Sequence, residues 1–368
     1  MGDLFSFIAE CGADDFSLRP LCDVDRLIFA QLSYCDFLPA MPLAPCPLPQ
    51  AVRAVLAAAP SPDASEERFA FQRSDDQRLL SLLLHAPRYA QVTFIDFTRL
   101  LCPDGQQFAA LTLAIDGMRL LAYRGTDNTL AGWKEDLALS CQPCIASQQE
   151  ALRYLLRQAQ AHPGALSVCG HSKGGNLALY AALHAPAGVQ DRLACAVSFD
   201  GPGFPSETLE RLLTPALAAR TRVLLPEGSL IGVLFSQPPQ VRTVACKWMG
   251  PLQHYPYFWQ VADGGFVDSP QTLFSRAAAL TMEKWLLRLS LAQREQFTGL
   301  LFDILQATRA QTLNDLVRGW FVNTLPIARA ILSRADMPNI RLCAHMLFSF
   351  WRALAESAGI LLSGPEKP

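Results

Sequence analysis

The order of apolar and polar positions divides the chain into three parts. Between about residues 90 and 260, short and continuously apolar runs alternate with stretches of helical pattern. Runs that are apolar without interruption are typical of strands that are buried on both faces of a sheet. We therefore predict an α/β core over residues 90–265, with a mostly parallel central sheet and helices on both of its faces.

The strands of this core are bounded by turn residues. Asp116 and Gly117 separate two of the apolar runs, and an Asp-Gly pair suits the tight turn of a β-hairpin. Helices are expected over Gln148–Ala161 and Gly174–His184. The expected strands are Val92–Phe97, Phe108–Ile115, Met118–Tyr123, Leu166–Cys169, Ala194–Phe199, Thr221–Leu225 and Val241–Cys246.

The N-terminal residues 1–89 predict a helical and irregular lead-in that packs on the core. Asp23–Leu32 has an amphipathic helical pattern. Residues 36–64 are rich in proline, which predicts an irregular surface segment with one short helix at 50–58. Residues 75–86 have the pattern of a further helix.

The C-terminal residues 266–368 contain no strand signal and predict an all-helical subdomain. Ser269-Pro270 and the capping box Ser290–Gln293 are start signals for two helices. A third helix is expected to start at Thr312, and a fourth to cover Pro338–Leu362. Because these helices carry many large apolar residues, we expect this tail to cover part of a functional site as a lid.

Composition narrows the classes of partner. The formal net charge is −2, and the chain has no long basic run, which argues against a nucleic-acid partner. No apolar run reaches the roughly 18–20 residues that cross a bilayer, so we predict no transmembrane segment and leave contact with a membrane surface open. The eleven cysteines are spread along the chain, which favours a reducing, cytoplasmic location. Cys141 and Cys144 form a CxxC pair without further metal ligands nearby, so we predict no metal site.

The strongest chemical signal is Gly170-His171-Ser172-Lys173-Gly174, which stands between a predicted strand and a predicted helix. In this context G-x-S-x-G is the nucleophile elbow of α/β hydrolases, where a sharp turn presents the serine hydroxyl. We therefore predict an α/β-hydrolase fold with Ser172 as nucleophile. The N–H of Lys173, at the start of the helix, would be one donor to an oxyanion.

A resemblance to the lipase class 3 family follows from the order of three motifs. Arg124-Gly125-Thr126 comes after a strand, Trp133 and Asp136 form a Trp-x-x-Asp pair, and Gly-His-Ser-x-Gly-Gly follows. In that family, the residue at the position of Thr126 holds the oxyanion with its N–H and hydroxyl groups. By resemblance, Thr126 takes this role here.

A wider resemblance connects the chain to an uncharacterised bacterial branch of lipase-like hydrolases. It rests on the stretch from Asp23 to Tyr34 and on the segments Gly170–Ala178, Asp200–Gly203, Ser229–Gly232 and Gln253–His254. The resemblance covers most of the chain to about residue 260. It implies a fold and a serine-hydrolase site, and it implies no particular substrate.

The general base is expected to be His254. In this fold the triad runs in the order serine, acid, histidine, so a base must follow Ser172 in the chain. His254 lies in a loop after the last predicted strand, and by resemblance it occupies the histidine position of the family. The other histidines precede the serine, lie within the elbow, or lie on predicted helices: His85, His162, His171, His184 and His345.

Two carboxylates compete for the acid position. Asp200 follows a predicted strand and precedes a Gly-Pro-Gly turn, and Glu227 follows the next strand. Both strands end at the rim that carries the elbow. Ser229 stands where class 3 lipases usually have their aspartate. We favour Asp200, because its shorter side chain and rigid turn would fix the base, and we keep Glu227 as the alternative.

These residues predict a serine hydrolase that cleaves a small-molecule or lipid acyl ester, or a thioester, through an acyl-enzyme, without metal or cofactor. A lipase or esterase is the first interpretation, and a peptidase or acyltransferase would use the same constellation. The alternative from another class is an inactive binding or scaffold protein on the same fold.

Overall fold

A computed structural model describes residues 1–58, 70–101, 107–127, 129–308, 310, 312, 315 and 320–363. Its centre is an eight-stranded sheet in which the strands lie in the order of the sequence, β1 to β8. Neighbours among β1 to β4 are antiparallel, and neighbours from β4 to β8 are parallel. The strands are β1 (Cys46–Pro47), β2 (Thr93–Leu101), β3 (Gln107–Ile115), β4 (Met118–Tyr123), β5 (Leu166–His171), β6 (Leu193–Phe199), β7 (Thr221–Pro226) and β8 (Val241–Val244).

The sequence prediction of an α/β core with a mostly parallel sheet is confirmed. The hairpin between β3 and β4 turns at Asp116 and Gly117, which both have positive φ. The short apolar runs became β5, β6 and β7 because their side chains are buried on both faces of the sheet.

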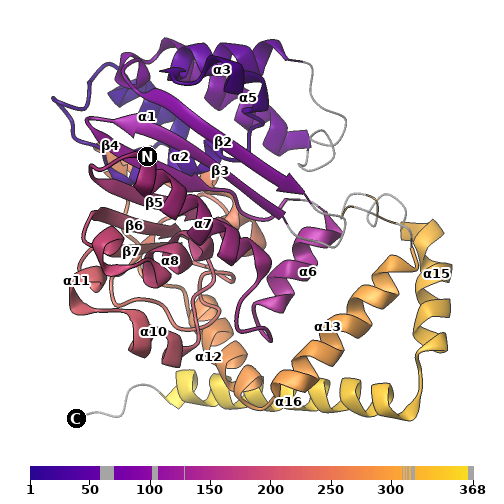
Figure 1. The fold of residues 1–368 in the computed structure, drawn as a ribbon. Helices are drawn as coiled ribbons and strands as arrows, with labels where there is room; N and C mark the ends of the chain where they lie inside the picture. Colours follow the sequence, from indigo (N-terminus) through magenta and orange to yellow (C-terminus); the bar gives the residue numbers. More distant parts are fainter. Residues whose placement is uncertain are drawn as a thin grey trace.

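Helices cover both faces of the sheet (Figure 1). The helices of one face come from the N-terminal stretch, and α7 and α8 pack on the other face. Alternate residues of β4 point to opposite faces, so Leu120 belongs to the first core and Leu121 to the second. The helices of these layers are α1 (Leu4–Cys11), α2 (Asp23–Leu32), α3 (Leu48–Ala57), α5 (Ala70–His85), α7 (Ala146–Ala161) and α8 (Lys173–His184).

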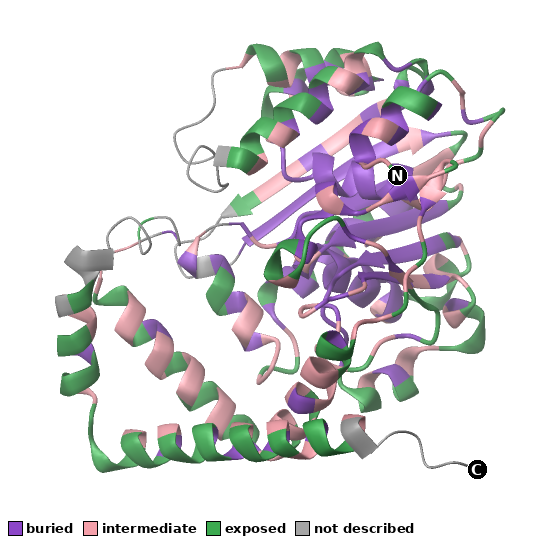
Figure 2. Cartoon of the chain, turned by 180° about the vertical axis from the view of Figure 1, so that it is seen from behind, coloured by how far each residue is buried: buried purple, intermediate pink, exposed green. Residues whose placement is uncertain are grey.

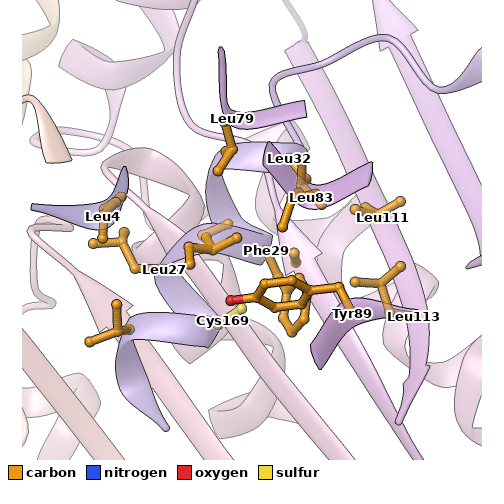
Figure 3. Packing of buried hydrophobic residues seen from close by; sticks show 14 of the residues in the cluster. Leu4, Leu27, Phe29, Leu32, Leu79, Leu83, Tyr89, Leu111, Leu113 and Cys169 are labelled. Atoms are coloured by element: carbon orange, nitrogen blue, oxygen red, sulfur yellow. The ribbon is translucent and has the colours of Figure 1, made fainter. Parts of the chain in front are cut away.

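The N-terminal helices join the main core rather than forming a separate one. Figure 3 shows how their side chains meet those of the sheet. The labelled members of this cluster are Leu4, Leu27, Phe29, Leu32, Leu79, Leu83, Tyr89, Leu111, Leu113 and Cys169. Arg88, which is fully buried, donates to the Asp25 carboxylate at 2.6 Å and thereby ties this layer together.

Short elements connect the strands at the edges of the sheet. The helix α6 (Leu130–Ala138) follows β4, and a small two-stranded sheet follows β8. The remaining short elements are η1 (Leu38–Leu43), η2 (Pro87–Tyr89), α9 (Ala187–Gln190), α10 (Ser206–Leu212), α11 (Pro215–Ala218), η3 (Gly250–His254), η4 (Pro256–Phe258), β9 (Val261–Ala262) and β10 (Gly265–Phe266).

The C-terminal part is helical, as predicted, and within the described residues no strand follows β10. Its helices α13, α15 and α16 extend away from the sheet (Figures 1 and 2). The Arg294 guanidinium donates to the Ser140 carbonyl at 2.8 Å, which joins α13 to the segment after α6. The helices are α12 (Leu273–Leu287), α13 (Leu291–Gln306), α15 (Trp320–Ser333) and α16 (Met337–Ser363).

One helix start differs from the sequence prediction. The first tail helix begins at Leu273, because the Ser269 hydroxyl donates to Glu227 while Thr272 caps α12 through Ser275 N–H. At the third predicted start, Thr312 and Asp315 exchange two capping hydrogen bonds, and residues 313, 314 and 316–319 lie outside the described residues. Residues 59–64 of the predicted irregular segment also lie outside them.

Candidate active site

Ser172 occupies a strained turn between β5 and α8. Its φ is +59°, a backbone conformation that residues other than glycine rarely adopt. Its N–H donates to the Phe199 carbonyl at 2.9 Å. A Cβ atom at Gly174 would lie 2.1 Å from the Tyr123 carbonyl oxygen, so glycine is required there. The local sequence therefore folds into the elbow because only glycine permits the close approach of β4 and α8.

His254 lies within hydrogen-bond distance of both the elbow and a carboxylate. Its Nε2 is 2.9 Å from Ser172 Oγ, and its Nδ1 is 2.6 Å from Asp200 Oδ2. Because an ionised carboxylate can only accept, Nδ1 carries the proton and Nε2 is free to accept from the serine hydroxyl. The arrangement can therefore move a proton from Ser172 to the imidazole.

Asp200 is fully buried, and the carboxylate oxygen that does not contact His254 is bound by two further groups. Its Oδ1 accepts the Ser229 hydroxyl and, at 3.0 Å, the Gly232 N–H. Ser229 thus fills the place where the resemblance expects an aspartate and supports the carboxylate at the end of the preceding strand. Glu227 points elsewhere, because its carboxylate accepts the Ser269 hydroxyl at the start of the tail. The structure brings Asp200 to His254 and does not bring Glu227 there.

A second histidine, His171, contacts the backbone of the proposed base His254. The sequence analysis did not predict this contact. His171 Nε2 lies 2.8 Å from the His254 carbonyl, which can only accept, so His171 carries its proton on Nε2. Its Nδ1 then accepts from the Tyr34 hydroxyl at 3.1 Å. Tyr34 reaches the site from the segment after α2. The sequence placed both residues within matching motifs but gave no sign of their contact.

Thr126 faces the elbow with its hydroxyl bound to a carboxylate. Its Oγ1 lies 2.6 Å from both carboxylate oxygens of Asp136, a residue of α6. Burial of the Asp136 carboxyl raises its pKa to about 6, although the Lys173 ammonium and the Thr126 hydroxyl both lower it. Asp136 is therefore mostly ionised at neutral pH and accepts from Thr126.

The Lys173 side chain lies almost completely buried beside the nucleophile. Its ammonium is 2.8 Å from Glu135 Oε2 and 3.9 Å from Asp136 Oδ1. Glu135 also accepts the Ser147 N–H at 2.9 Å, so this ion pair joins α6, α7 and the elbow. Lys173 is the first residue of α8, and its N–H therefore has no partner inside the helix.

Replacing Lys173 by methionine should lower the free energy of unfolding by about 3–5 kcal/mol, since a buried carboxylate would lose its counter-ion. Denaturant unfolding of the Lys173→Met variant measures this loss. The double variant Lys173→Met/Glu135→Gln removes both charges, keeps an oxygen that can accept the Ser147 N–H, and should recover most of the lost stability. A single variant as stable as the wild type would show that the pair is not coupled to folding.

A cavity of about 340 Å³ opens beside Ser172. Its wall includes Ser172, His254, Thr126 and Lys173 and is otherwise mainly aromatic and aliphatic. The apolar part of the wall comes from α5, from α6 and the residue after it, from the segments that follow β6 and β7, and from the loop around His254. These apolar residues are Phe71, Trp133, Leu137, Leu139, Pro202, Ile231, Leu234, Phe235, Pro251, Leu252, Tyr255 and Pro256.

The C-terminal tail does not line this cavity in the described part of the chain. All of the described wall residues precede β9, and α13 of the tail contacts α6, which contributes to the wall. That the tail acts as a lid over the site stays a prediction. None of the described helices is both long and apolar enough to span a bilayer.

Comparison with known proteins gives one family and several distant structures. The sequence profile of the Mbeg1-like family matches residues 83–303. A search of curated proteins found no match. Among solved structures, the chain is similar to lipase II from Rhizopus niveus (15% identity, 60% of this chain and 78% of that chain covered, TM-score 0.35). It is also similar to the Rhizomucor miehei lipase in its propeptide complex (16%, 62% and 69%, TM-score 0.33) and to M37 lipase (13%, 57% and 68%, TM-score 0.34).

Proposed function

The chain belongs to the Mbeg1-like family, and from the geometry of its site we propose that it is a serine hydrolase that cleaves an ester or thioester through an acyl-enzyme. The observation that carries the proposal is the continuous hydrogen-bond chain from Ser172 Oγ through His254 to Asp200. A strained elbow, an oriented imidazole and a buried carboxylate together meet the requirements of nucleophilic catalysis by serine.

In the proposed reaction, Ser172 Oγ attacks the acyl carbon while His254 Nε2 takes the hydroxyl proton. His254 then gives this proton to the leaving alcohol or thiol as the acyl–oxygen or acyl–sulfur bond breaks. A water molecule then attacks the acyl carbon while His254 takes its proton, the bond between the acyl carbon and Ser172 Oγ breaks, and His254 returns the proton to Ser172 Oγ as the acid leaves. Asp200 fixes the imidazole throughout and stays ionised.

We assign the oxyanion to two backbone donors. The N–H of Lys173 lies at the start of α8, where the helix dipole also favours negative charge. The hydroxyl of Thr126 is engaged by Asp136, so the N–H of Thr126 is the second donor. The bond to Asp136 would hold the threonine loop in place beside the elbow.

The cavity supports an apolar acyl group and an uncharged leaving group. Apart from the catalytic histidine and His171, the described wall has one cationic side chain, Lys173, which is already paired with Glu135. Asp127 and Asp136 also belong to the wall. A leaving group with phosphates, such as that of an acyl-coenzyme A, would find no counter-ion and would meet these carboxylates. We therefore favour a carboxylic ester of a neutral alcohol.

A fluorophosphonate probe tests the proposal directly. The folded protein should form one covalent adduct, and peptide mass spectrometry should place it on Ser172. Hydrolysis of p-nitrophenyl esters should accompany the labelling, and kcat/KM should rise from acetyl to medium-length acyl chains as the apolar wall becomes covered. Heat-denatured protein is the control for non-specific reaction.

Absence of the adduct in folded protein would contradict the proposal. Such a result would instead favour the non-catalytic alternative, a binding or scaffold protein on the same fold. An adduct on a serine other than Ser172 would also contradict the assignment of the site.

A further inference from the structure

The long helix α16 has two apolar faces that point in opposite directions. One face packs on the neighbouring tail helices through Leu342, Met346 and Ala353, which are all buried. The other face carries a row of large apolar side chains that the structure leaves exposed. These five residues, called here the outer face, are Met337, Ile340, Leu347, Phe348 and Trp351.

The spacing of the outer face follows the helical repeat, so its members form one stripe about 21 Å long at a rise of 1.5 Å per residue. Phe348 is 70% exposed and Trp351 is 63% exposed. Figure 2 shows α16 at the margin of the molecule with exposed residues along its length. An exposed stripe of this size usually marks an interaction surface.

The inner face holds α16 in a defined orientation. Trp285 of α12 donates to the Met346 carbonyl at 3.0 Å and meets the ring of Phe350 edge-on. Glu356 accepts from Arg288 at 2.6 Å and lies 3.6 Å from the Lys284 ammonium. These contacts hold Met346, Phe350 and Glu356 against α12. The outer face of α16 therefore points away from the rest of the tail.

The charged side chains that border the outer face along α16 are mainly cationic, and one exposed acid, Asp336, precedes Met337 at the end of the row. Arg341, His345 and Arg352 are exposed on α16. The only acidic residue in α16 is Glu356, which faces the inner anchors and also pairs with Arg352 at 3.2 Å. Aromatic and aliphatic side chains bordered by arginines are the composition of a helix that lies in the headgroup region of a bilayer.

We propose that the outer face of α16 binds the surface of a membrane that contains anionic phospholipids. The helix would lie parallel to the bilayer, with Phe348 and Trp351 at the acyl boundary and Arg341 and Arg352 at the phosphates. Contact with a second copy is less favourable, because a symmetric pairing of this face would bring the exposed Arg341 side chains of the two copies to the same interface, whereas phosphates would pair with them. α16 lies outside the segment that the Mbeg1-like profile matches, so the proposal is independent of the proposed catalytic function.

Vesicle flotation with the full chain tests the proposal. The protein should float with vesicles of equal parts phosphatidylcholine and phosphatidylglycerol, and much less with pure phosphatidylcholine. High salt should weaken the binding, because it screens the arginines. The Arg341→Gln/Arg352→Gln variant should lose roughly 30-fold in affinity, at about 1 kcal/mol for each arginine.

The variant Phe348→Glu/Trp351→Glu should abolish flotation, whereas Leu18→Glu/Leu43→Glu, which alters exposed leucines of the N-terminal region, should leave it unchanged. Circular dichroism checks that each variant is folded, and the arginine variant tests the proposal without changing the apolar stripe. Wild-type protein that stays unbound to anionic vesicles would overturn the proposal. So would sedimentation showing a dimer without lipid that Phe348→Glu/Trp351→Glu converts to a monomer, since the face would then join two copies.

Discussion

Replacing Ser172 by alanine is expected to lower ester turnover by about 10⁶-fold and to remove the fluorophosphonate adduct. The variant lacks the only hydroxyl that His254 Nε2 contacts in the described structure, so the base would have no nucleophile to activate. The loss should appear in kcat, because the cavity wall that binds the acyl group is unchanged.

The Ser172→Ala variant should lose activity without losing thermal stability. The positive φ of the elbow is imposed by the glycines around it and is equally strained for serine and alanine, so the melting temperature should change little. Ser167→Ala is a matched control, because Ser167 is a fully buried serine of β5, the strand that leads into the elbow, and it is absent from the cavity wall. Adduct formation that persists in Ser172→Ala would disprove the assignment.

The local part of the site could be predicted because its signals are short. The elbow needs one strand, one turn and one helix, and the sequence contains all of them between Leu166 and His184. The hairpin at Asp116 and Gly117 is equally local. In both cases the residues that determine the backbone are neighbours in the chain, so no tertiary information is required.

The long-range part of the site could not be settled in the same way. Asp200 and Glu227 both end strands at the same rim, and only the path of the chain to His254 separates them. The contacts of Tyr34 and His171 join segments that lie far apart in sequence, so no short motif could predict them.

The tail shows the same limit. The N-cap at Ser290 and the apolar pattern predicted the helices of the tail. The angle between packed helices, however, depends on which of their apolar faces meet. α16 is apolar on both sides, so sequence alone could not tell which side packs on α12. The expectation of a lid rests on the number of apolar residues in the tail, and such a number does not give the direction in which their side chains point.

Replacing Asp200 by asparagine should lower kcat by about 10⁴-fold while the fold is kept. The reason lies in the partners of the buried carboxylate. Its Oδ1 accepts from the Ser229 hydroxyl and the Gly232 N–H, so the one amide oxygen of asparagine would be held on that side. The amide NH₂ group would then face His254 Nδ1 as a donor, and the imidazole would carry its proton on Nε2.

An imidazole protonated on Nε2 cannot accept the Ser172 proton, so the base would be present but in the wrong tautomer. Steady-state kinetics on a p-nitrophenyl ester measure the loss, with circular dichroism as the check on folding. Glu227→Gln is the matched control, because that carboxylate accepts from Ser269 and does not reach the base. It should keep turnover within a few-fold of the wild type.

The Ser229→Ala/Asp200→Asn double variant separates the tautomer effect from a loss of charge. Without the Ser229 hydroxyl, the Gly232 N–H alone competes for the amide oxygen, and the amide can rotate so that its oxygen accepts from His254 Nδ1. The double variant should therefore regain part of the activity that Asp200→Asn loses, although it removes one more polar group from the site. If Glu227→Gln instead lost orders of magnitude in kcat and Asp200→Asn did not, Asp200 would not be the acid that orients the base.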